Sequence, residues 1–255
     1  MQKLFKGLKM GFSKTLLLNK KILITGAGKG IGRACALLAA ECGANVIAVA
    51  RTESDLRDLA AVYPNNITYW VADVSDEAFL EKLKSLSSLD GLINNAGVNR
   101  VAPMLDQTSD NIDTVFDMNI KHVYKVTQAA LPALLSSKNG SIVNMSSQMA
   151  FVGSPGRTLY CTSKHAIEGM TKSLAVELAE QHIRVNSVAP TFVETPMTKP
   201  MLEDPEFKKF VYDMIPMKKL ANVNDVANSC IFLLSDLTQM ITGTSIKIDG
   251  GWTAR

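Results

Sequence analysis

The chain has 255 residues, 47% of them hydrophobic and 20% charged, and its formal net charge is +3. This composition supports a large buried core and excludes a mainly disordered chain, and the Lys and Arg residues are too scattered to form a nucleic-acid-binding surface. Length alone would allow two domains, but α/β chains of this size usually form one.

Residues 1–19 carry several lysines and a short apolar run at 16–18. The run is too short for the core of a signal peptide or for a membrane span. We expect a flexible basic arm here, followed by a single domain over 20–255. The arm is either an extension upstream of a start at Met10 or a lysine-bearing transit segment. No other targeting signal is present, which predicts a cytoplasmic protein without membrane contact.

Apolar runs of strand length then alternate with longer helical patterns, as in stacked β-α-β units on a parallel sheet. The predicted strands are 22–25, 46–50, 67–72, 89–94, 141–145, 184–188 and 244–248. The predicted helices are 31–41, a helix from about 53, 76–86, 107–137 and 157–180. No repeat or linker interrupts the pattern. We therefore predict an α/β, Rossmann-type single domain, with a doubly wound parallel seven-stranded sheet and helices on both faces.

Cysteine and histidine spacing argues against a metal centre. The four cysteines form no C-x-x-C pair, and most lie in apolar helical patterns where a thiol behaves as a small hydrophobic group. The histidines form no ligand spacing with each other or with the cysteines. We therefore predict no metal and a reducing compartment.

The first chemically informative motif joins the first predicted strand to the first predicted helix and reads TGAGKGIG over 25–32. Glycines there let the backbone turn sharply and approach a pyrophosphate, which then meets the positive end of the helix. In this strand-turn-helix context the pattern predicts a dinucleotide site rather than a simple tight turn. The predicted cofactor-binding residues of the turn are Gly26, Gly28, Lys29, Gly30, Ile31 and Gly32.

The end of the second predicted strand indicates which dinucleotide binds. A carboxylate there would accept hydrogen bonds from a ribose 2′-hydroxyl, but the chain has Arg51 followed by Thr52. An arginine suits a 2′-phosphate, and Lys29 adds a second positive charge. We therefore predict NADP(H) rather than NAD(H), with a solvated Arg51 as the alternative. Glu53 and Asp55 are assigned to the following helix N-terminus, where Thr52 and Asp55 would cap it reciprocally.

Tyr160 and Lys164 lie four residues apart in a predicted helix, which places a phenol and an ammonium group on one face. A lysine held against a tyrosine favours the phenolate, so the phenol pKa would move from about 10 toward neutrality and suit acid–base chemistry. The alternative is a solvated lysine beside a packed tyrosine.

Several motifs together resemble the short-chain dehydrogenase/reductase family, in its order and spacing, from about residue 20 to the C-terminus. They are the glycine turn, NNAG at 94–97, Ser147, and the Tyr160-x-x-x-Lys164 pair. Asn119 matches the family's fourth catalytic residue. Ser147 lies thirteen residues before Tyr160, as in the family, and is chosen on that spacing over its neighbour Ser146.

The resemblance implies a mechanism of carbonyl reduction and a homotetramer. Ser147 and Tyr160 would hydrogen-bond the carbonyl oxygen, and Tyr160 would donate the proton as the nicotinamide supplies hydride. Lys164 would raise the acidity of Tyr160 and hold the nicotinamide ribose. Asn119 would occupy a helix irregularity with a water that relays protons. The catalytic residues implied are Asn119, Ser147, Tyr160 and Lys164.

The resemblance also implies further cofactor contacts after the predicted strands. Asp73, with Val74, would accept a hydrogen bond from the adenine amino group, unless it caps the following helix. Thr195 would meet the nicotinamide carboxamide, unless it caps a helix before Pro196. The remaining implied contacts are Asn95, Ala96, Gly97, Pro190 and Val193, together with Tyr160 and Lys164.

Two segments are predicted to shape the substrate site. Residues 191–219, rich in Met and Pro, suit a lid that closes over substrate. The residues between the serine and the tyrosine would line the rest of the pocket, namely Gln148, Met149, Phe151, Val152 and Arg157. Arg157 is interpreted as a surface arginine, with attraction of an anionic substrate as the alternative.

Within the family, the chain looks closest to dicarbonyl and L-xylulose reductases and related carbonyl reductases, on the stretches 25–33, 50–52, 183–188, 204–207 and 231–236. It departs from them at 190–191, where Pro-Thr replaces Pro-Gly, and at 249–252, which is more like ketoacyl and gluconate-type reductases. We therefore expect NADPH-dependent reduction of a ketone, ketose or dicarbonyl compound. A 3-oxoacyl-thioester reductase is the enzymatic alternative, and a non-catalytic NADP(H)-binding sensor or scaffold is the alternative of another class.

Overall fold

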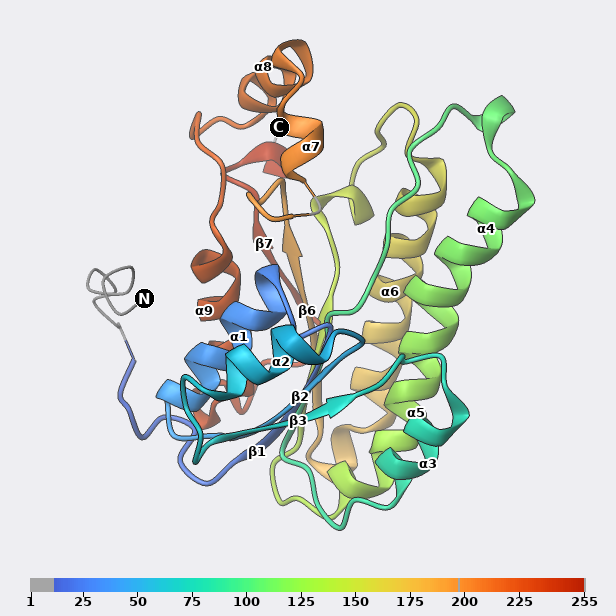
Figure 1. Ribbon diagram of the computed structural model, residues 1–255. Helices are drawn as coiled ribbons and strands as arrows, with labels where there is room; N and C mark the ends of the chain where they lie inside the picture. Colours follow the sequence, from blue (N-terminus) through green and yellow to red (C-terminus); the bar gives the residue numbers. More distant parts are fainter. Residues whose placement is uncertain (1–11, 197, 255) are drawn as a thin grey trace.

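Seven parallel strands form one sheet, in the order β3-β2-β1-β4-β5-β6-β7, within residues 12–196 and 198–254, which are those that the structure, a computed structural model, describes (Figure 1). The strands are β1 (Lys21–Thr25), β2 (Asn45–Ala50), β3 (Ile67–Val71), β4 (Gly91–Asn94), β5 (Ser141–Met145), β6 (Arg184–Pro190) and β7 (Ser245–Ile248). The central strands are buried along their whole length, which explains why they read as continuous apolar runs. The predicted fold class is confirmed.

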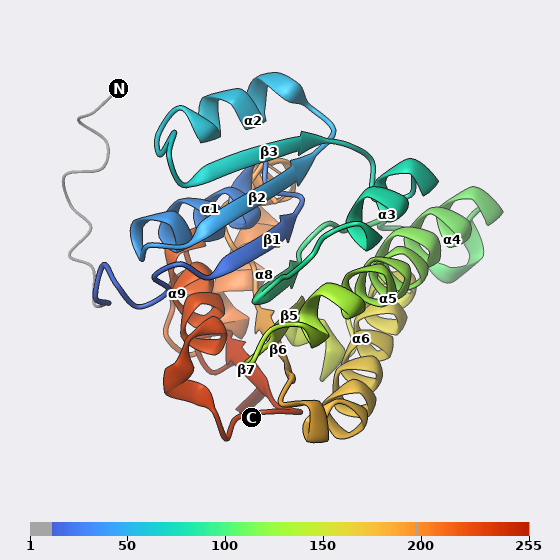
Figure 2. The same cartoon turned by 90° about the horizontal axis from the view of Figure 1, so that it is seen from below.

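Helices cover both faces of the sheet (Figure 2). One face packs against α1 (Gly30–Glu41), α2 (Glu53–Ala60) and α9 (Val223–Leu234). The other face packs against α3 (Glu77–Lys84), α5 (His122–Leu135) and α6 (Thr158–Glu177), and α4 (Ser109–Phe116) extends this layer. The sequence analysis assigned no helix to 223–234, yet α9 makes extensive contacts with α1 and completes the first core.

Residues 12–19 pack against the body of the domain, so the flexible arm expected over 1–19 does not extend over them. Leu17 is fully buried, and its amide donates to the carbonyl of Cys42 at 2.9 Å. The amide of Asn19 donates to the carbonyl of Gly43 at 3.1 Å. The two alternatives for the arm, including the start at Met10, concern residues 1–11, which lie outside the described residues.

Two segments differ from their predicted outlines. The helix expected over 107–137 consists of α4 and α5, joined by a π-helical turn at Asp117–Lys121. The segment expected as a lid, 191–219, carries two short helices, α7 (Lys199–Leu202) and α8 (Pro205–Met214); its Met197 lies outside the described residues. None of the described helices is both long and apolar enough to cross a membrane.

A chain of buried polar side chains ties the middle of the sheet to two helices. Asn94 on β4 donates to Thr127 on α5 and to Asn144 on β5, at 2.9 Å in both cases. Asn144 in turn donates to Thr171 on α6 at 2.9 Å. All four side chains are buried, so these bonds satisfy groups that would otherwise carry a desolvation penalty.

The strand order places a crevice at one edge of the sheet. Successive strands run outward from β1 to β3 on one side, and from β4 to β7 on the other, so the direction of winding reverses between β1 and β4. Loops that leave the carboxyl ends of these two neighbouring strands diverge to opposite faces, and ligands bind at such a point in doubly wound sheets.

Candidate active site

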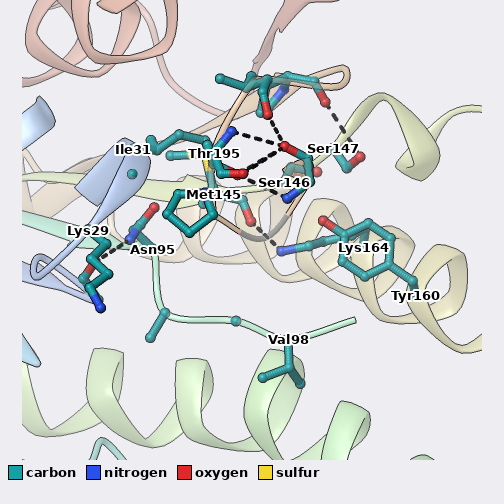
Figure 3. A pocket seen from close by; sticks show the side chains of 18 of the residues that line it. Lys29, Ile31, Asn95, Val98, Met145, Ser146, Ser147, Tyr160, Lys164 and Thr195 are labelled. Carbon is teal, nitrogen blue, oxygen red and sulfur yellow. Dashed lines mark hydrogen bonds between the residues drawn. The ribbon is translucent and has the colours of Figure 1, made fainter. Parts of the chain in front are cut away.

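A cavity of about 310 Å³ lies at this reversal point. Its walls come from the segments that follow β1, β4, β5 and β6, and from α6 (Figure 3). Predicted site residues that line it are Gly26, Lys29, Gly30, Ile31, Asn95, Ala96, Gly97, Ser147, Tyr160, Lys164, Pro190, Val193 and Thr195. The sequence analysis did not select Val98, Met145, Thr191, Pro196 or Thr198, which also line it. Val98 and Thr191 lie within four residues of the ends of predicted strands and Met145 ends one, which was the available signal, whereas Pro196 and Thr198 belong to the predicted lid.

The glycine turn and the loop after β4 are locked together. Gly26 has a φ of +66°, and a Cβ there would lie 2.8 Å from Nδ2 of Asn95. That amide nitrogen donates to the carbonyls of Thr25 at 3.0 Å and Gly26 at 3.1 Å. A Cβ on Gly32 would lie 2.3 Å from the carbonyl oxygen of Gly26. These two glycines are therefore required by backbone packing, which keeps the start of α1 open to the cavity.

Two cations stand near the ends of β1 and β2, and each is paired with a carboxylate. Nζ of Lys29 lies 3.2 Å from Oδ2 of Asp55, and Nη1 of Arg51 lies 3.6 Å from Oδ2 of Asp73. The lysine side chain is 64% exposed and the arginine side chain 75% exposed. Exposed pairs of this kind hold their partners weakly, so both cations can rearrange around a phosphate.

The predicted reciprocal cap of α2 does not form, and neither does the cap by Asp73 that was the alternative to its adenine role. Thr52 occupies the N-cap position of α2 but makes no side-chain hydrogen bond there, and Asp55 contacts Lys29 instead. Asp73 does not cap α3, whose N-cap is Asp76. Oδ1 of Asp73 accepts hydrogen bonds from the amide and hydroxyl of Ser75, at 2.9 and 2.8 Å. Hydrogen bonds from Ser75 and the charge of Arg51 hold the pKa of Asp73 below its usual value, against the effect of burial.

Gly28, Gly32, Arg51, Thr52, Asp73 and Val74 do not line the cavity itself. Thr52, Asp73 and Val74 follow β2 and β3, the strands next to β1 on the side away from β4. Thr52, Asp73 and Val74 therefore lie along the sheet edge toward β3, where the far end of a dinucleotide would extend. Gly28 and Gly32 belong instead to the turn after β1 and to α1.

Tyr160 and Lys164 lie one turn apart on α6, and their side chains run side by side toward β5 (Figure 3). Nζ of Lys164 donates to the carbonyl of Met145 at 2.7 Å and lies 5.5 Å from the centroid of the Tyr160 ring. Lys164 is only 6% exposed, so the alternative of a solvated lysine is wrong. The strand backbone fixes the position of the ammonium group.

The titration behaviour of this pair differs from the expectation. Burial raises the pKa of Tyr160 above 10.0, while a hydrogen bond with Ser147 and the charge of Arg157 act in the opposite direction. Burial also lowers the pKa of Lys164 to about 8, which the charge of Glu168 partly opposes. Desolvation therefore sets the direction of the phenol's shift, and Lys164, which was expected to move this pKa toward neutrality, is not among the groups that lower it. The phenol of Tyr160 is therefore protonated at neutral pH and can act as an acid.

The two neighbouring serines have different surroundings. Oγ of Ser147 donates to Oε1 of Gln148 at 2.8 Å and accepts from the amide of Met149 at 3.2 Å, and the Ser147 hydroxyl also acts on the Tyr160 phenol, whose pKa it lowers. Oγ of Ser146 is buried and has no partner among the described residues. The contact with Tyr160 favours Ser147 for the predicted role.

Asn119 lies in the π-helical turn between α4 and α5 and is 1% exposed. Its side-chain oxygen accepts from the amide of Val98 at 2.8 Å, and its nitrogen donates to the carbonyl of Val98 at 2.9 Å. The nitrogen also donates to Oγ of Ser163 at 3.1 Å. Asn119 therefore connects the loop after β4 with α6 and fixes one wall of the cavity.

The predicted lid packs on the start of α6 through apolar and aromatic side chains. Phe192, Val211, Ile215 and Trp252 form a buried cluster with Met149, against which Tyr160 also packs. Thr195 does not cap α7, whose N-cap is Thr198; instead the two hydroxyls lie 3.1 Å apart. Arg157 is 4% exposed beneath this segment, so its interpretation as a surface arginine is wrong.

No group of three or more His, Cys, Asp or Glu side chains within residues 12–196 and 198–254 could hold a metal ion.

Comparisons with known proteins show which proteins this chain is similar to. A family model described as enoyl-(acyl carrier protein) reductase matches residues 26–253. The L-xylulose reductase of Mus musculus is 39% identical over 240 residues, which cover 93% of this chain and 98% of that protein. The 3-oxoacyl-[acyl-carrier-protein] reductase of Thermotoga maritima is 40% identical over 240 residues, covering 91% and 97%. The solved structure of a gluconate 5-dehydrogenase from Burkholderia cenocepacia, in complex with NADP and tartrate, superposes with a TM-score of 0.89 at 27% identity, covering 95% of this chain and 98% of that one.

Proposed function

The chain belongs to the short-chain dehydrogenase/reductase family, and from this premise we propose that it is an NADPH-dependent reductase of a ketone, ketose or dicarbonyl compound. The observation that carries the proposal is the meeting of Tyr160, Ser147 and Lys164 in the cavity that begins at the glycine turn. The L-xylulose reductase of Mus musculus supports the substrate class, because most of both chains align.

The residues of this chain fit NADP(H). The N-cap of α1, Lys29, makes no side-chain hydrogen bond, so the first amides of the helix are free for a pyrophosphate. Lys29 and Arg51 would hold the 2′-phosphate, and Asp73 with Val74 would hold the adenine. Lys164 would bind the nicotinamide ribose. The gluconate 5-dehydrogenase from Burkholderia cenocepacia, solved with NADP, supports this assignment. When bound, NADPH supplies the hydride.

The chain's own side chains then complete the reduction. Tyr160 donates its phenolic proton to the carbonyl oxygen, while the carbonyl carbon accepts the hydride, so that an alcohol forms. A raised pKa keeps this phenol protonated at neutral pH, as an acid requires. Ser147 hydrogen-bonds the same oxygen and stabilises the negative charge that develops on it. Lys164 holds a positive charge next to the phenol, and solvent restores the proton.

A 3-oxoacyl-thioester reductase is a second candidate function. The Thermotoga maritima enzyme supports it, since its identity to this chain is similar to that of the L-xylulose reductase. Both candidates use the same proton donor and differ only in the group attached to the carbonyl. A non-catalytic NADP(H) sensor is disfavoured because the groups needed for proton transfer are all present in the cavity.

The test is NADPH oxidation by the purified full chain with three matched sets of compounds: diketones, ketoses and acetoacetyl thioesters. We expect loss of the reduced-nicotinamide absorbance with the first two sets, and a higher kcat/KM there than with the thioesters. A higher kcat/KM with the thioesters would favour the second candidate. Tight NADPH binding without oxidation by any set would refute a reductase and support the sensor.

We also propose a cytoplasmic homotetramer. Large apolar side chains are exposed on the outer helices, such as Tyr124 on α5 at 57% and Val176 on α6 at 81%, and near β7, where Met240 is 95% exposed. Such groups are typical of surfaces that bind another chain. Light scattering should give four times the chain mass of 27.7 kDa, and a monomer would contradict the proposal. Fluorescence imaging of a carboxyl-terminal fusion tests the compartment.

A further inference from the structure

We propose that Arg157 binds a carboxylate of the substrate, so that the preferred substrates are oxo acids. This inference rests on the proposed reductase function and narrows its substrate class. Arg157 directly precedes α6, and its guanidinium lies beneath the segment 191–219. It is a cation enclosed by protein next to the proton donor.

Among the described residues, aromatic rings and a thioether, and no carboxylate, contact the guanidinium of Arg157. Its Cζ lies 5.6 Å from the ring centroids of both Phe192 and Phe207, and its Nη2 contacts Sδ of Met201 at 3.2 Å. No carboxylate of residues 12–196 and 198–254 forms an ion pair with it. A thioether is a weak acceptor, and ring faces only partly replace water around a guanidinium.

A second buried arginine, Arg184, has a structural role and serves as a comparison for Arg157. Arg184 on β6 is 7% exposed, similar to Arg157. Its Nη1 donates to the carbonyl of Leu233 and to Oγ1 of Thr238, both at 2.7 Å, and its Nη2 donates to the carbonyl of Ser235 at 3.2 Å. Oxygen acceptors therefore satisfy Arg184 within the fold. Arg157 has the same charge and similar burial, but none of the described oxygen atoms accepts a hydrogen bond from its guanidinium, and we assign that acceptor to a ligand.

Arg157 is also placed to reach a substrate at Tyr160. Arg157 is the N-cap residue of α6 and stands three positions before Tyr160, about one helical turn from it along the chain. The Arg157 charge is felt at the phenol, whose pKa it lowers. Phe192, one of the two rings over the guanidinium, follows the cavity residue Thr191 and packs in the same cluster as Tyr160. A carboxylate on Arg157 would thus be joined by a short carbon chain to a carbonyl at Tyr160.

A second, independent group near the proton donor lacks an acceptor. Gln148 is 1% exposed, and its Oε1 accepts from Oγ of Ser147, which holds the amide beside the catalytic hydroxyl. Nε2 of the same amide is buried and has no partner among the described residues. The guanidinium of Arg157 and this amide nitrogen are both donors without an oxygen acceptor among the described residues, so a ligand that satisfies them presents acceptor oxygens. One guanidinium matches the single charge of a carboxylate better than the charge of about −2 on a phosphate monoester.

The first test compares oxo acids with their primary amides, which keep the carbon skeleton and remove the charge. We expect the wild-type protein to have a kcat/KM roughly 10- to 100-fold higher for the acid, as for other hydrogen bonds to charged groups. Arg157→Met should abolish this preference, mainly through a higher KM for the acid, so that the acid and the amide have similar kcat/KM. Arg100→Met, which removes an exposed arginine after β4, should keep the preference.

The second test measures binding without turnover. The chain has two tryptophans. In Trp70→Phe the remaining Trp252 lies 6.0 Å from the Phe192 ring, by centroids, and reports on the segment over Arg157. With NADP⁺ present, titration with a hydroxy acid should change its fluorescence in a saturable way. The corresponding hydroxy amide, and the hydroxy acid in a background that also carries Arg157→Met, should give no such change.

Three outcomes would overturn the inference: equal kcat/KM for acid and amide, equal losses for both in Arg157→Met, or hydroxy-acid binding that survives this substitution. The first leaves the reductase function intact if the amides are reduced. Absence of NADPH oxidation with every carbonyl would instead refute the proposed function, and the fluorescence titration would still decide whether Arg157 binds a carboxylate. Thermal unfolding of Arg157→Met, expected at or above the wild-type temperature, shows that the variant folds.

Discussion

The two halves of the sheet hold their positive charges in opposite ways. Near β1 and β2, Lys29 and Arg51 are exposed, and each has a carboxylate partner. Near β5 and β6, Lys164 and Arg157 are buried, and neither forms an ion pair with a described carboxylate. The exposed pairs are weak and rearrange easily, whereas the buried cations are fixed before any ligand arrives.

This difference matches the tasks proposed for the two halves. A cofactor phosphate brings its own charge and binds at an edge open to water, so mobile cations suffice there. A carbonyl oxygen gains charge only during the reaction, and donors that are already oriented stabilise that charge most effectively. We therefore expect substitutions in the buried half to have the larger effects.

The largest effect is expected for Tyr160→Phe, which removes the proposed proton donor and keeps the ring. The kcat for carbonyl reduction should fall about 10³-fold, within the usual range for general acid catalysis. NADPH affinity, measured by fluorescence titration, should stay nearly the same. Tyr124→Phe is the matched control, because Tyr124 is exposed on α5. A Tyr160→Phe variant with normal kcat would place the proton donor elsewhere.

The next largest effect is expected on the pH dependence of the free energy of unfolding, through Lys164. Its pKa in the folded protein is lowered from 10.5 to about 8, so between these values the unfolded chain binds a proton that the folded chain lacks. Lys164 should therefore make the free energy of unfolding rise with pH over this interval, by about 3 kcal/mol in total.

Cys42 acts in the opposite direction, since burial raises its pKa from 9.0 to about 11 and its contribution to stability falls with pH over that interval. The test is therefore the difference between the wild-type protein and Lys164→Met in urea unfolding, from about pH 7.5 to 10. Because both proteins contain Cys42, its contribution to the pH dependence cancels in this difference. Parallel curves for the two proteins would mean that Lys164 titrates normally in the fold.

At the exposed edge, Arg51→Asp should lower the ratio of kcat/KM for NADPH to that for NADH by roughly 10-fold, because one charge-assisted phosphate contact is lost and a repulsive carboxylate is added. Steady-state kinetics with both cofactors measure this ratio. Arg57→Asp makes the same charge change on the exposed side of α2 and should leave the ratio unchanged. An unaltered ratio in Arg51→Asp would remove the basis for the 2′-phosphate assignment.

The smallest effect is expected for Thr52→Ala, because this N-cap side chain makes no hydrogen bond to α2. The free energy of unfolding should change by less than about 0.5 kcal/mol. Asn222→Ala is the comparison, since Asn222 forms a complete capping box with Asp225 on α9 and should cost about 1 kcal/mol. Chemical denaturation measures both. A larger loss of unfolding free energy in Thr52→Ala would show that this side chain does cap α2, as predicted.

The fold could be predicted from the sequence because its strands are short apolar runs separated by clear helices. The expected strand over 141–145 coincides with β5, and that over 184–188 was short only by the last two residues of β6. The helix α9 was not predicted because it directly follows a Met- and Pro-rich segment that is typical of a loop, and this segment obscures where the helix begins. Its capping box at Asn222 was a usable local signal.

The site was predicted less evenly, because a sequence pattern gives positions along the chain but not burial. The motifs selected Ser147, Tyr160 and Lys164, and the structure places all three in the lining of one cavity. They did not reveal that burial sets the pKa of Tyr160, since desolvation depends on packing by distant segments. Arg157 was misjudged for the same reason: the rings that cover it, Phe192 and Phe207, lie more than thirty residues away along the chain.

The four polar side chains in the middle of the sheet also bear on how the chain reaches its native alignment. Asn94 and Asn144 face each other across β4 and β5, between Thr127 and Thr171. A slip of one residue between these strands would turn one amide to the opposite face and leave buried groups unpaired, at about 1–3 kcal/mol for each. Apolar strands alone would tolerate such a slip. The amides therefore disfavour misaligned folding intermediates, so the sheet edge that carries Tyr160's cavity forms in a single register.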